Sequence, residues 1–322
     1  MKTILLTLCM ALTSLSLFAQ QDALYSQYMF NGLALNPAYA GNKGVLNVNL
    51  INRNQWVGQK VIGAPRTQAF TADGSFYEGK VGLGIHIIND KIGAQTQQTA
   101  MASYSYKIPV SETAELSFGL GGGVSNYVLD GTLLTSTDQG DVAIPTERIS
   151  HFTPDVNFGV YLSHDEYYAG LSTTHLLTLK AKGAFANDVN LQRHYYLNGG
   201  YIFPINDFIR AYPSMLIKTD LKGPMNVDVN AFVLALDKFG LGASYRTGVY
   251  TQKGDYSPGI FKSNSVVAMA QVYMLDQQLR VGYSYDFDLS KIGYSRNTHE
   301  ISLGYIIKTN DILKNMSSPR YY

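Results

Sequence analysis

The sequence predicts an all-β protein, namely a transmembrane outer-membrane β-barrel of about 14 antiparallel strands with an irregular N-terminal segment. Three observations lead to this prediction. Apolar and polar side chains alternate along most of the chain, short and long connections alternate between these segments, and only 15% of the residues are charged. Ordinary soluble domains carry about 25% charged residues, whereas a surface that faces lipid tolerates few of them.

The composition excludes several other classes of protein. The 322 residues include 25 basic and 24 acidic residues, and 46% are hydrophobic. A disordered chain needs low hydrophobicity and a high net charge. A nucleic-acid-binding protein usually carries a basic excess, so we expect no nucleic acid partner. A single cysteine excludes a fold built on disulfide bonds.

Residues 1–19 have the features of a secretory signal peptide. A basic start at Lys2 is followed by an apolar run and by the small residue Ala19. We predict cleavage between Ala19 and Gln20, with an N-terminal membrane anchor as the alternative. The apolar run is shorter than the roughly 20 residues that a spanning helix needs. Cleavage would also remove Cys9 and leave the mature chain without cysteine.

Alternation with a period of two residues is clearest near the C-terminus. From Leu279 to Phe287 every second residue is apolar or aromatic, and the residues between them are polar or glycine. A strand with one apolar and one polar face has this period. The same pattern predicts fourteen strands, centred near residues 50, 71, 85, 101, 120, 158, 171, 198, 213, 230, 243, 269, 283 and 303. Pro213 and the weakly apolar stretch 66–77 fit the pattern poorly, so the count is predicted to within one strand.

The connections between the predicted strands alternate in length. Short polar turns are predicted near residues 79, 111, 165, 206, 237 and 277, and longer connections include 127–152, 177–192 and 248–262. Outer-membrane barrels have one end with short turns and one end with long loops. With an even number of strands, both termini are predicted on the periplasmic side. The alternative is a soluble protein of two packed sheets, which would need more charge on its exterior.

The sequence shows no motif for catalysis, cofactor binding or metal binding, and we predict that the chain is not an enzyme. The histidines lack the spacing of a metal site and are better explained as lumen or interface residues: His86, His151, His164, His175, His194 and His299. The glycines of 119–123 lack the lysine of a phosphate-binding loop, and a strand packed against lumen contents explains them better. A hydrolase whose catalytic groups meet only in space stays open as an alternative.

Residues 20–44 do not alternate and precede the first predicted strand. The segment is aromatic, polar and irregular, with a turn favoured at Asn36 and Pro37 and a positive φ expected at Gly41. A barrel of about fourteen strands has an interior too wide for its own side chains to fill. We therefore predict that this segment plugs the lumen or docks a partner. The barrel is predicted over residues 45–308 and a periplasmic C-terminal tail over 309–322.

Seven blocks of the sequence form a recognisable series, at residues 27–41, 53–58, 63–68, 84–93, 167–172, 280–285 and 299–305. In order and spacing these blocks resemble the PorP/SprF family of type IX secretion system membrane proteins. The resemblance implies a cell outer-membrane barrel of Bacteroidota-type bacteria that supports protein secretion or gliding motility. The implied partners are outer-membrane lipid, the periplasmic ring and associated lipoproteins of the secretion system, and/or the C-terminal domain of a secreted adhesin or enzyme. A plugged channel for small solutes is the alternative function.

The residues that we expect to matter most lie in the first two of these blocks: Asn36, Pro37, Tyr39, Gly41, Arg53, Gln55 and Trp56. The functional interpretation is a docking element that positions a substrate domain or a partner protein. The alternative is that the segment only fills and stiffens the lumen, because any plug has to satisfy its own polar groups. Trp56, the single tryptophan, is equally well explained as an interface anchor. The family resemblance implies no cofactor.

Overall fold

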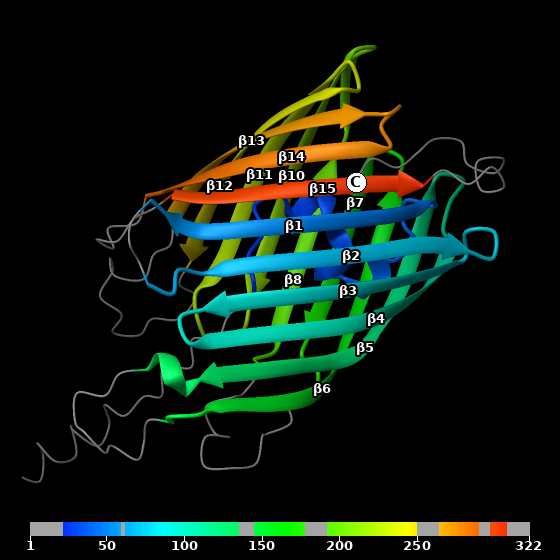
Figure 1. The fold of residues 1–322 in the computed structure, drawn as a ribbon. Coiled ribbons are helices and arrows are strands. Elements are labelled where there is room, and N and C mark those ends of the chain that lie inside the picture. The colour runs from blue at the N-terminus through cyan, green and yellow to red at the C-terminus, as the bar shows by residue number, and fades with distance from the viewer. Residues whose placement is uncertain are drawn as a thin grey trace, which may run out of the picture.

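The computed structural model describes residues 22–58, 62–134, 145–177, 192–249, 264–289 and 297–307. These residues form one antiparallel sheet that closes into a barrel (Figure 1). Its strands are β1 (Leu46–Val57), β2 (Arg66–Phe76), β3 (Val81–Ile92), β4 (Gln95–Pro109), β5 (Ala114–Asp130), β6 (Arg148–His164), β7 (Tyr167–Thr174), β8 (His194–Tyr201), β9 (Phe203–Asn206), β10 (Ile209–Thr219), β11 (Met225–Ala235), β12 (Phe239–Val249), β13 (Asn264–Met274), β14 (Leu279–Asp288) and β15 (Asn297–Ile307). The predicted signal peptide, its cleavage site and the predicted tail 309–322 lie outside the described residues.

The barrel has fourteen strands, as predicted. The ring closes where β1 pairs with β15, with Leu46 opposite Ile307. Both β8 and β9 pair with β10, so they count as one interrupted strand. No helix in the described part of the chain is long and apolar enough to cross a membrane.

The interruption between β8 and β9 explains how Pro213 fits into β10. The pairing of β10 passes from β8 to β9 between Ser214 and Ala211. Pro213 lies opposite this break, where the ladder is already interrupted and the missing N–H of proline is tolerated. On its other side Pro213 pairs with Ala231 of β11 without a change of register.

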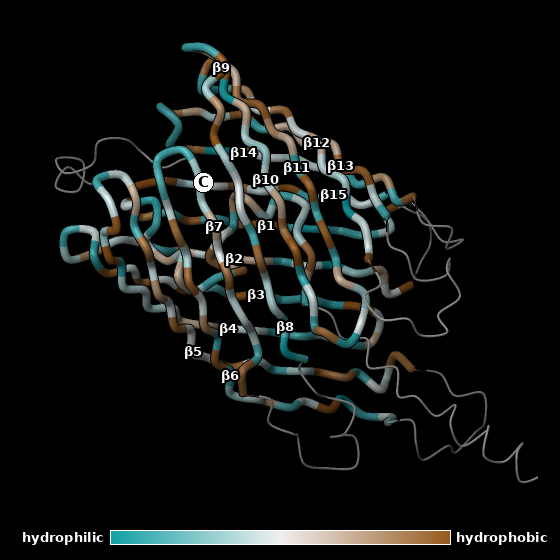
Figure 2. The backbone as a smooth tube through the Cα atoms, turned by 180° about the vertical axis from the view of Figure 1, so that it is seen from behind, coloured by the Kyte–Doolittle hydropathy of each residue, from teal (hydrophilic) through white to brown (hydrophobic). Residues whose placement is uncertain are grey.

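Side chains alternate between the outside and the inside of the barrel. Outward-facing apolar side chains remain exposed, for example Leu50, Leu241 and Leu303, whereas the inward-facing neighbours Asn49 and Ser302 are buried. Figure 2 shows the resulting alternation of apolar and polar residues along the strands. The outer face therefore suits lipid and the inner face is polar, as the sequence pattern predicts.

The two ends of the barrel differ in their connections. At one end, called the short-turn end below, the connections have two to four residues, such as 165–166 and 275–278. At the other end, the long-connection end, they include 131–147, 175–193 and 250–263. Strand β1 begins and β15 ends at the short-turn end.

Residues 22–44, called the lumen segment below, lie inside the barrel. They form three short helical turns, η1 (Tyr28–Phe30), α2 (Gly32–Leu35) and η2 (Pro37–Tyr39), and a fourth turn, η3 (Gly131–Leu133), follows β5. Figure 1 shows the first three turns enclosed by the strands. Most side chains of the segment are buried. That the segment blocks passage through the barrel stays a prediction.

Candidate functional site

The lumen segment runs along the barrel from the long-connection end to the short-turn end. Asp22 lies beside His175 and His194, which flank the long connection between β7 and β8. Gly41 lies beside Asp73 of β2, near the short-turn end. The segment therefore contacts the wall along its length. The predicted periplasmic position of the N-terminus concerns residues before Asp22, outside the described ranges, and stays a prediction.

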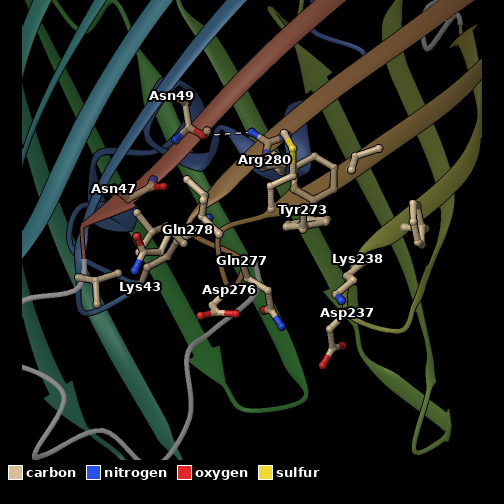
Figure 3. Close-up of a pocket in the computed structure, with 18 of the residues that line it drawn as sticks. Lys43, Asn47, Asn49, Asp237, Lys238, Tyr273, Asp276, Gln277, Gln278 and Arg280 are labelled. Carbon is tan, nitrogen blue, oxygen red and sulfur yellow. Dashed lines mark hydrogen bonds between the residues drawn. The ribbon is translucent and has the colours of Figure 1, made fainter.

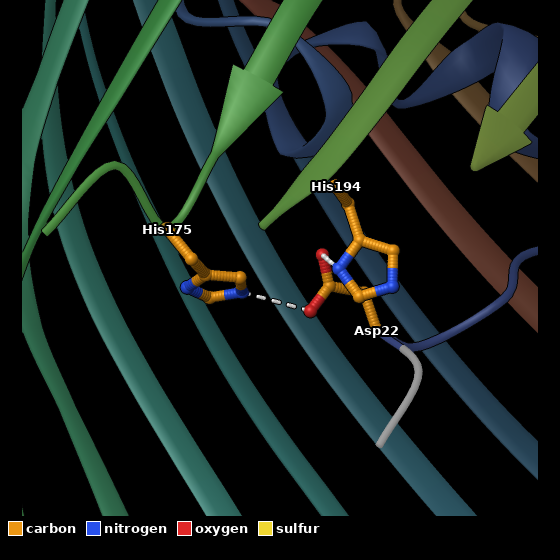
Figure 4. A group of neighbouring side chains, drawn as sticks. All are labelled: Asp22, His175 and His194. Carbon is orange, nitrogen blue, oxygen red and sulfur yellow. Dashed lines mark hydrogen bonds and ion pairs between the residues drawn. The ribbon is translucent and has the colours of Figure 1, made fainter. Parts of the chain in front are cut away.

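The Asp22 carboxylate binds several groups of the wall (Figure 4). His175 Nε2 is 2.8 Å from Asp22 Oδ1, and the Tyr196 hydroxyl donates to Oδ2 at 2.7 Å. The second ring nitrogen of His175 is 2.6 Å from Asp155 Oδ2. The ring is thus held between two carboxylates, an arrangement that suits the doubly protonated form, in which both nitrogens donate. We call Asp22, Asp155, His175, His194 and Tyr196 the Asp22 cluster.

Burial and charge set the protonation of this cluster. Burial lowers the pKa of His175, but the Asp22 charge and hydrogen bonds to Asp155 and Asp22 raise this pKa to about 10. Burial raises the pKa of Asp22, but the charges of His175, His194 and Lys218 hold it well below its usual range. Both Asp22 and His175 lie outside the strands. The pair is therefore ionised at neutral pH.

Among the described residues, Asp22, His175 and His194 form the one group that could hold a metal ion. Each offers a ligand atom, and these atoms lie within 4.8 Å of one another. A histidine nitrogen must be unprotonated to bind a metal. Both nitrogens of His175 contact carboxylates, so metal binding would require the loss of a proton. The geometry therefore favours an ion pair that ties the lumen segment to the wall.

Farther along the segment, two backbone N–H groups donate to Glu300 of β15. Ser26 donates to Oε2 at 2.8 Å and Gln27 to Oε1 at 2.9 Å. Arg53 of β1 is 3.1 Å from the same carboxylate and 2.6 Å from Asp286 of β14. It also donates to the Ser26 hydroxyl at 2.6 Å. Arg53, one of the predicted site residues, thus holds the segment at the seam between β1 and β15.

A second arginine extends this network to β11 and β12. Arg246 donates to Asp228 at 2.7 Å and to the backbone carbonyl of Tyr25 at 3.1 Å. It also lies 3.5 Å from Asp286. Buried ion pairs tolerate the loss of water only when their members are paired, and each charged side chain of this network has at least one charged partner. The network fixes residues 25–27 against five strands.

Asn36 fixes the predicted turn. Its side-chain oxygen accepts from the Ala38 N–H at 2.9 Å, which caps η2, and its amide donates to the carbonyl of Val160 on β6 at 3.0 Å. A Cβ at Gly159 would lie 2.0 Å from the Asn36 oxygen, and a Cβ at Gly119 would lie 2.1 Å from the Ala38 nitrogen. At Gly119, the interpretation of small residues packed against lumen contents is confirmed.

Tyr39 fills the lumen beside β6 and β7. Its ring meets Tyr161 edge to face with centroids 5.4 Å apart, and Tyr161 stacks on Tyr168. A Cβ at Gly32 would lie 2.5 Å from the Tyr39 ring. Pro37, which begins η2, is buried with it. Aromatic packing therefore holds this part of the segment, in contrast to the ionic contacts near residues 22 and 26.

Gly41 has the predicted positive φ, at +67°. Its N–H donates to Asp73 at 2.8 Å, and its carbonyl accepts a hydrogen bond from Lys107. A Cβ at this position would lie 2.7 Å from the carbonyl oxygen of Gly74. Glycine is therefore required here both by the backbone conformation and by the space available.

Gln55 and Trp56 lie apart from the lumen segment. Both belong to the end of β1, where its register with β15 shifts, at the long-connection end. Trp56 is half-buried with a φ of +56°, and the Gln55 N–H donates to the Pro65 carbonyl at 2.9 Å. The structure thus gathers five of the seven predicted residues in the lumen. A docking role for any of them stays a prediction.

The firmest anchors of the segment were not singled out from the sequence. Asp22 contacts His175, and Ser26 contacts Glu300, although the partners are 153 and 274 positions apart. The one local signal is the place of Glu300 on the polar parity of its strand. That parity predicts an inward side chain but does not identify its partner.

A cavity of about 910 Å³ remains in the lumen at the short-turn end. Its lining includes Lys43 and Phe30 of the lumen segment, Tyr273 and Arg280 of the wall, and the turn 275–278 (Figure 3). The segment therefore leaves part of the lumen open beside β12 to β15.

A family model described as "Type IX secretion system membrane protein PorP/SprF" matches residues 17–305. The chain belongs to this family. The PorP/SprF match spans the lumen segment and almost the whole barrel, so the resemblance seen in the sequence blocks is confirmed. No curated protein matches the chain.

Solved structures similar to this PorP/SprF chain are outer-membrane barrels. The CymD monoaromatic hydrocarbon channel has a TM-score of 0.51 at 10% identity, over 87% of this chain and 93% of that one. A Pseudomonas aeruginosa FadL homologue has a TM-score of 0.47 at 10% identity, over 84% and 92%. KdgM porin has a TM-score of 0.39 at 7% identity, over 81% and 99%. Identities this low concern the fold alone.

The closed barrel and the family match together define the class of this PorP/SprF protein. Its outer face is apolar and its backbone is paired around the full ring, as a membrane requires. It is an outer-membrane β-barrel associated with type IX secretion.

Proposed function

We propose that the protein supports type IX secretion, or the attachment of secreted adhesins or enzymes at the cell surface, through protein–protein contacts. The family match over residues 17–305 is the observation that carries this proposal. The structure agrees with a scaffold, because the ionic contacts of Asp22 and Ser26 and the packing of Tyr39 hold the interior to the wall.

We also propose that the protein is not an enzyme. A catalytic histidine needs a free nitrogen to take up a proton. The ring of His175 is instead held by Asp22 and Asp155. The His164 ring bonds Thr113 in an exposed contact at the short-turn end, and no carboxylate of the described residues forms an ion pair that would orient it.

Affinity purification from the native outer membrane, followed by mass spectrometry, tests the main proposal. Recovery of periplasmic ring components indicates a role in the core machinery. Recovery of one large secreted protein indicates a dedicated partner. Purification of the barrel with neither, together with normal secretion in a deletion strain, would falsify the proposal.

Deletion of residues 22–43 tests whether the lumen segment has a docking role. A docking segment predicts that the shortened barrel folds and inserts but no longer supports secretion. Heat-modifiability on gels establishes folding, and surface protease digestion establishes insertion. Normal secretion through a folded, inserted variant would limit the segment to filling and stiffening the lumen.

A plugged channel for small solutes is a second candidate function. Two observations favour it: the fold resembles the CymD monoaromatic hydrocarbon channel, and a cavity of about 910 Å³ remains in the lumen. A channel predicts measurable conductance or solute flux when the purified barrel is reconstituted in lipid. An electrically silent barrel that also gives no flux in liposomes would exclude this function.

A further inference from the structure

Two buried cationic side chains line the cavity at the short-turn end without a carboxylate partner among the described residues. Lys43, at the end of the lumen segment, is only 7% exposed, and Arg280 of β14 is only 6% exposed. Neither forms a salt bridge with any described residue. Largely buried charges without a direct counter-charge are unfavourable, so an anion in the cavity would stabilise both side chains.

Neutral groups fix the orientation of Arg280 but do not compensate its charge. Its guanidinium donates to Ser302 at 3.2 Å and to Asn49 at 3.0 Å. It also lies 4.5 Å from the centre of the Phe30 ring. These contacts hold the guanidinium in place beside the cavity (Figure 3).

The nearby carboxylates already serve other groups. Asp73 accepts from the Gly41 N–H at 2.8 Å and from Asn47 at 3.1 Å. Glu300 is bound by two backbone N–H groups and by Arg53. Both carboxylates act on the two cations only at longer range, because neither lies within salt-bridge distance of Lys43 or Arg280.

The remaining lining combines an apolar wall with a charged rim. Phe30, Val45 and Tyr273 line the cavity. Asp237 and Asp276 lie on the turns at its rim (Figure 3). Asp237 is paired with Arg210, which reduces its repulsion of an anion. Lys238 adds a positive charge on the same turn. The buried cations thus lie inside the cavity and the carboxylates at its edge.

We propose that this cavity binds an organic anion in which one carboxylate is attached to an apolar body. The carboxylate lies between Lys43 and Arg280 and supplies the missing counter-charge, and the apolar body contacts Phe30 and Tyr273. The cavity of about 910 Å³ is within the range of ligand sites, about 300–1,000 Å³. A small amphipathic acid and the C-terminal carboxylate of a partner protein both offer this chemistry.

The protonation of Lys43 agrees with this assignment. Burial and the neighbouring charge of Arg280 lower the pKa of Lys43 to about 8, although the charge of Asp73 acts in the opposite direction. Lys43 is therefore still cationic at neutral pH, and a bound carboxylate raises its pKa again.

Calorimetric titration of the full mature barrel in lipid nanodiscs tests the site. The first probe is 4-phenylbutyrate, and its control is the uncharged 4-phenylbutyramide of the same shape. The second pair is an N-acetylated apolar tetrapeptide with a free C-terminal carboxylate and the same peptide as its amide. We expect a carboxylate to bind at least about tenfold more tightly than its amide, as a charge-assisted hydrogen bond predicts.

The two pairs separate the two sources of the carboxylate. A preference confined to phenylbutyrate indicates a small acid, and a preference confined to the peptide indicates a partner's C-terminus. Equal affinity for acid and amide in both pairs overturns the proposal. This outcome leaves the proposed function intact, because the cavity proposal does not rest on it.

A lysine variant connects the preference to the cavity. Lys43→Met removes a side chain that makes no hydrogen bond with the described residues, so the barrel is expected to fold. We expect it to reduce the preference for acid over amide at least about fivefold, in keeping with the contribution of one charged partner. The matched control is Lys80→Met, an exposed lysine on another turn of the same end. An unchanged preference in Lys43→Met would place the anion elsewhere.

Discussion

At the scale of single residues, Gly41 sets how closely the lumen segment approaches the wall. Its φ of +67° and the 2.7 Å that would separate an added Cβ from the Gly74 carbonyl oxygen both disfavour a side chain. The positive φ follows from local turn chemistry and is predictable from the sequence. The lack of space for a side chain depends on Gly74, which is far along the chain, and is visible only in the folded barrel.

We expect Gly41→Ala to destabilise the barrel by at least about 1 kcal/mol, because alanine at positive φ is strained and the added methyl group has no space. Urea unfolding in lipid measures the change. The matched control is Gly79→Ala, at a glycine with φ +91° and no atom within 4 Å of the added Cβ. Equal losses in the two variants would show that the contact with the wall contributes nothing.

Lys43→Met should stabilise the unliganded barrel by about 1–3 kcal/mol, because it removes a buried charge without a counter-charge. The folded pKa of Lys43, about 8, is below the value of about 10.4 for an exposed lysine. The destabilisation caused by the charge of Lys43 is therefore complete below pH 8. It decreases between pH 8 and about 10.4 and is absent above that range. Urea unfolding of both proteins across this pH range checks the prediction, and a pH-independent difference would contradict it.

At the scale of elements, the lumen segment is held by different contacts at different points along its length. The Asp22 ion pair holds one end, the arginine network holds residues 25–27, and aromatic packing holds Tyr39. Period-two alternation could not reveal these contacts, because it reports which face a side chain occupies and not what it meets. The irregular composition of residues 20–44 did indicate that the segment is not a strand.

The Asp22 ion pair should make the mobility of this end depend on pH. His175 has a raised pKa of about 10 in the folded barrel. The stabilisation that it gives to the ion pair is therefore complete below about pH 6.5 and is lost as the pH rises through 10. Asp22 has a lowered pKa, so its contribution is present above about pH 3.9 and is lost in acid. A spin label at Ala23→Cys should be least mobile between about pH 4 and 6.5 and clearly more mobile above pH 10.

Two control proteins accompany the spin-label experiment. Asp22→Asn should flatten the pH dependence of the label at position 23, because it removes one partner of the ion pair. A label at Ala268→Cys, on the outer face of β13, should keep the same mobility when the pH is changed and when Asp22 is replaced by Asn. A label at position 23 that stays equally immobile at every pH would mean that other contacts hold this end.

Arg53→Met should be among the most damaging single changes in the barrel. It leaves Glu300 and Asp286 without their Arg53 contacts, and removal of one member of a buried ion pair costs about 3–5 kcal/mol. The exposed arginine variant Arg66→Met should change stability by less than about 0.5 kcal/mol. Urea unfolding of both variants in lipid measures the difference, and similar values would contradict a structural role for the network.

At the scale of the whole molecule, strand number and the orientation of each face were predictable from the sequence. Each strand of a membrane barrel carries its own alternation, so fourteen separate signals indicated one architecture. The break between β8 and β9 was not predictable, although Pro213 marked its position. Closeness in sequence also failed to predict which residues lie together in the lumen. Gln55 and Trp56 follow Arg53 closely in the chain but lie at the end of β1, away from the lumen segment.

Removal of the lumen segment should change the electrical behaviour of the whole barrel. Fourteen strands enclose an interior that their own side chains do not fill, so deletion of residues 22–43 should raise single-channel conductance several-fold. Planar-bilayer recordings of the native and shortened barrels measure it. An unchanged conductance in a folded, shortened barrel would mean that the segment does not limit passage.

The position of the arginine network connects the lumen segment to the closure of the barrel. Its charged groups come from β1, β11, β12, β14 and β15 and therefore include the first and the last strand. The network is complete only when these two strands are paired. The full set of contacts that holds residues 25–27 therefore depends on closure of the ring by strands from opposite ends of the chain.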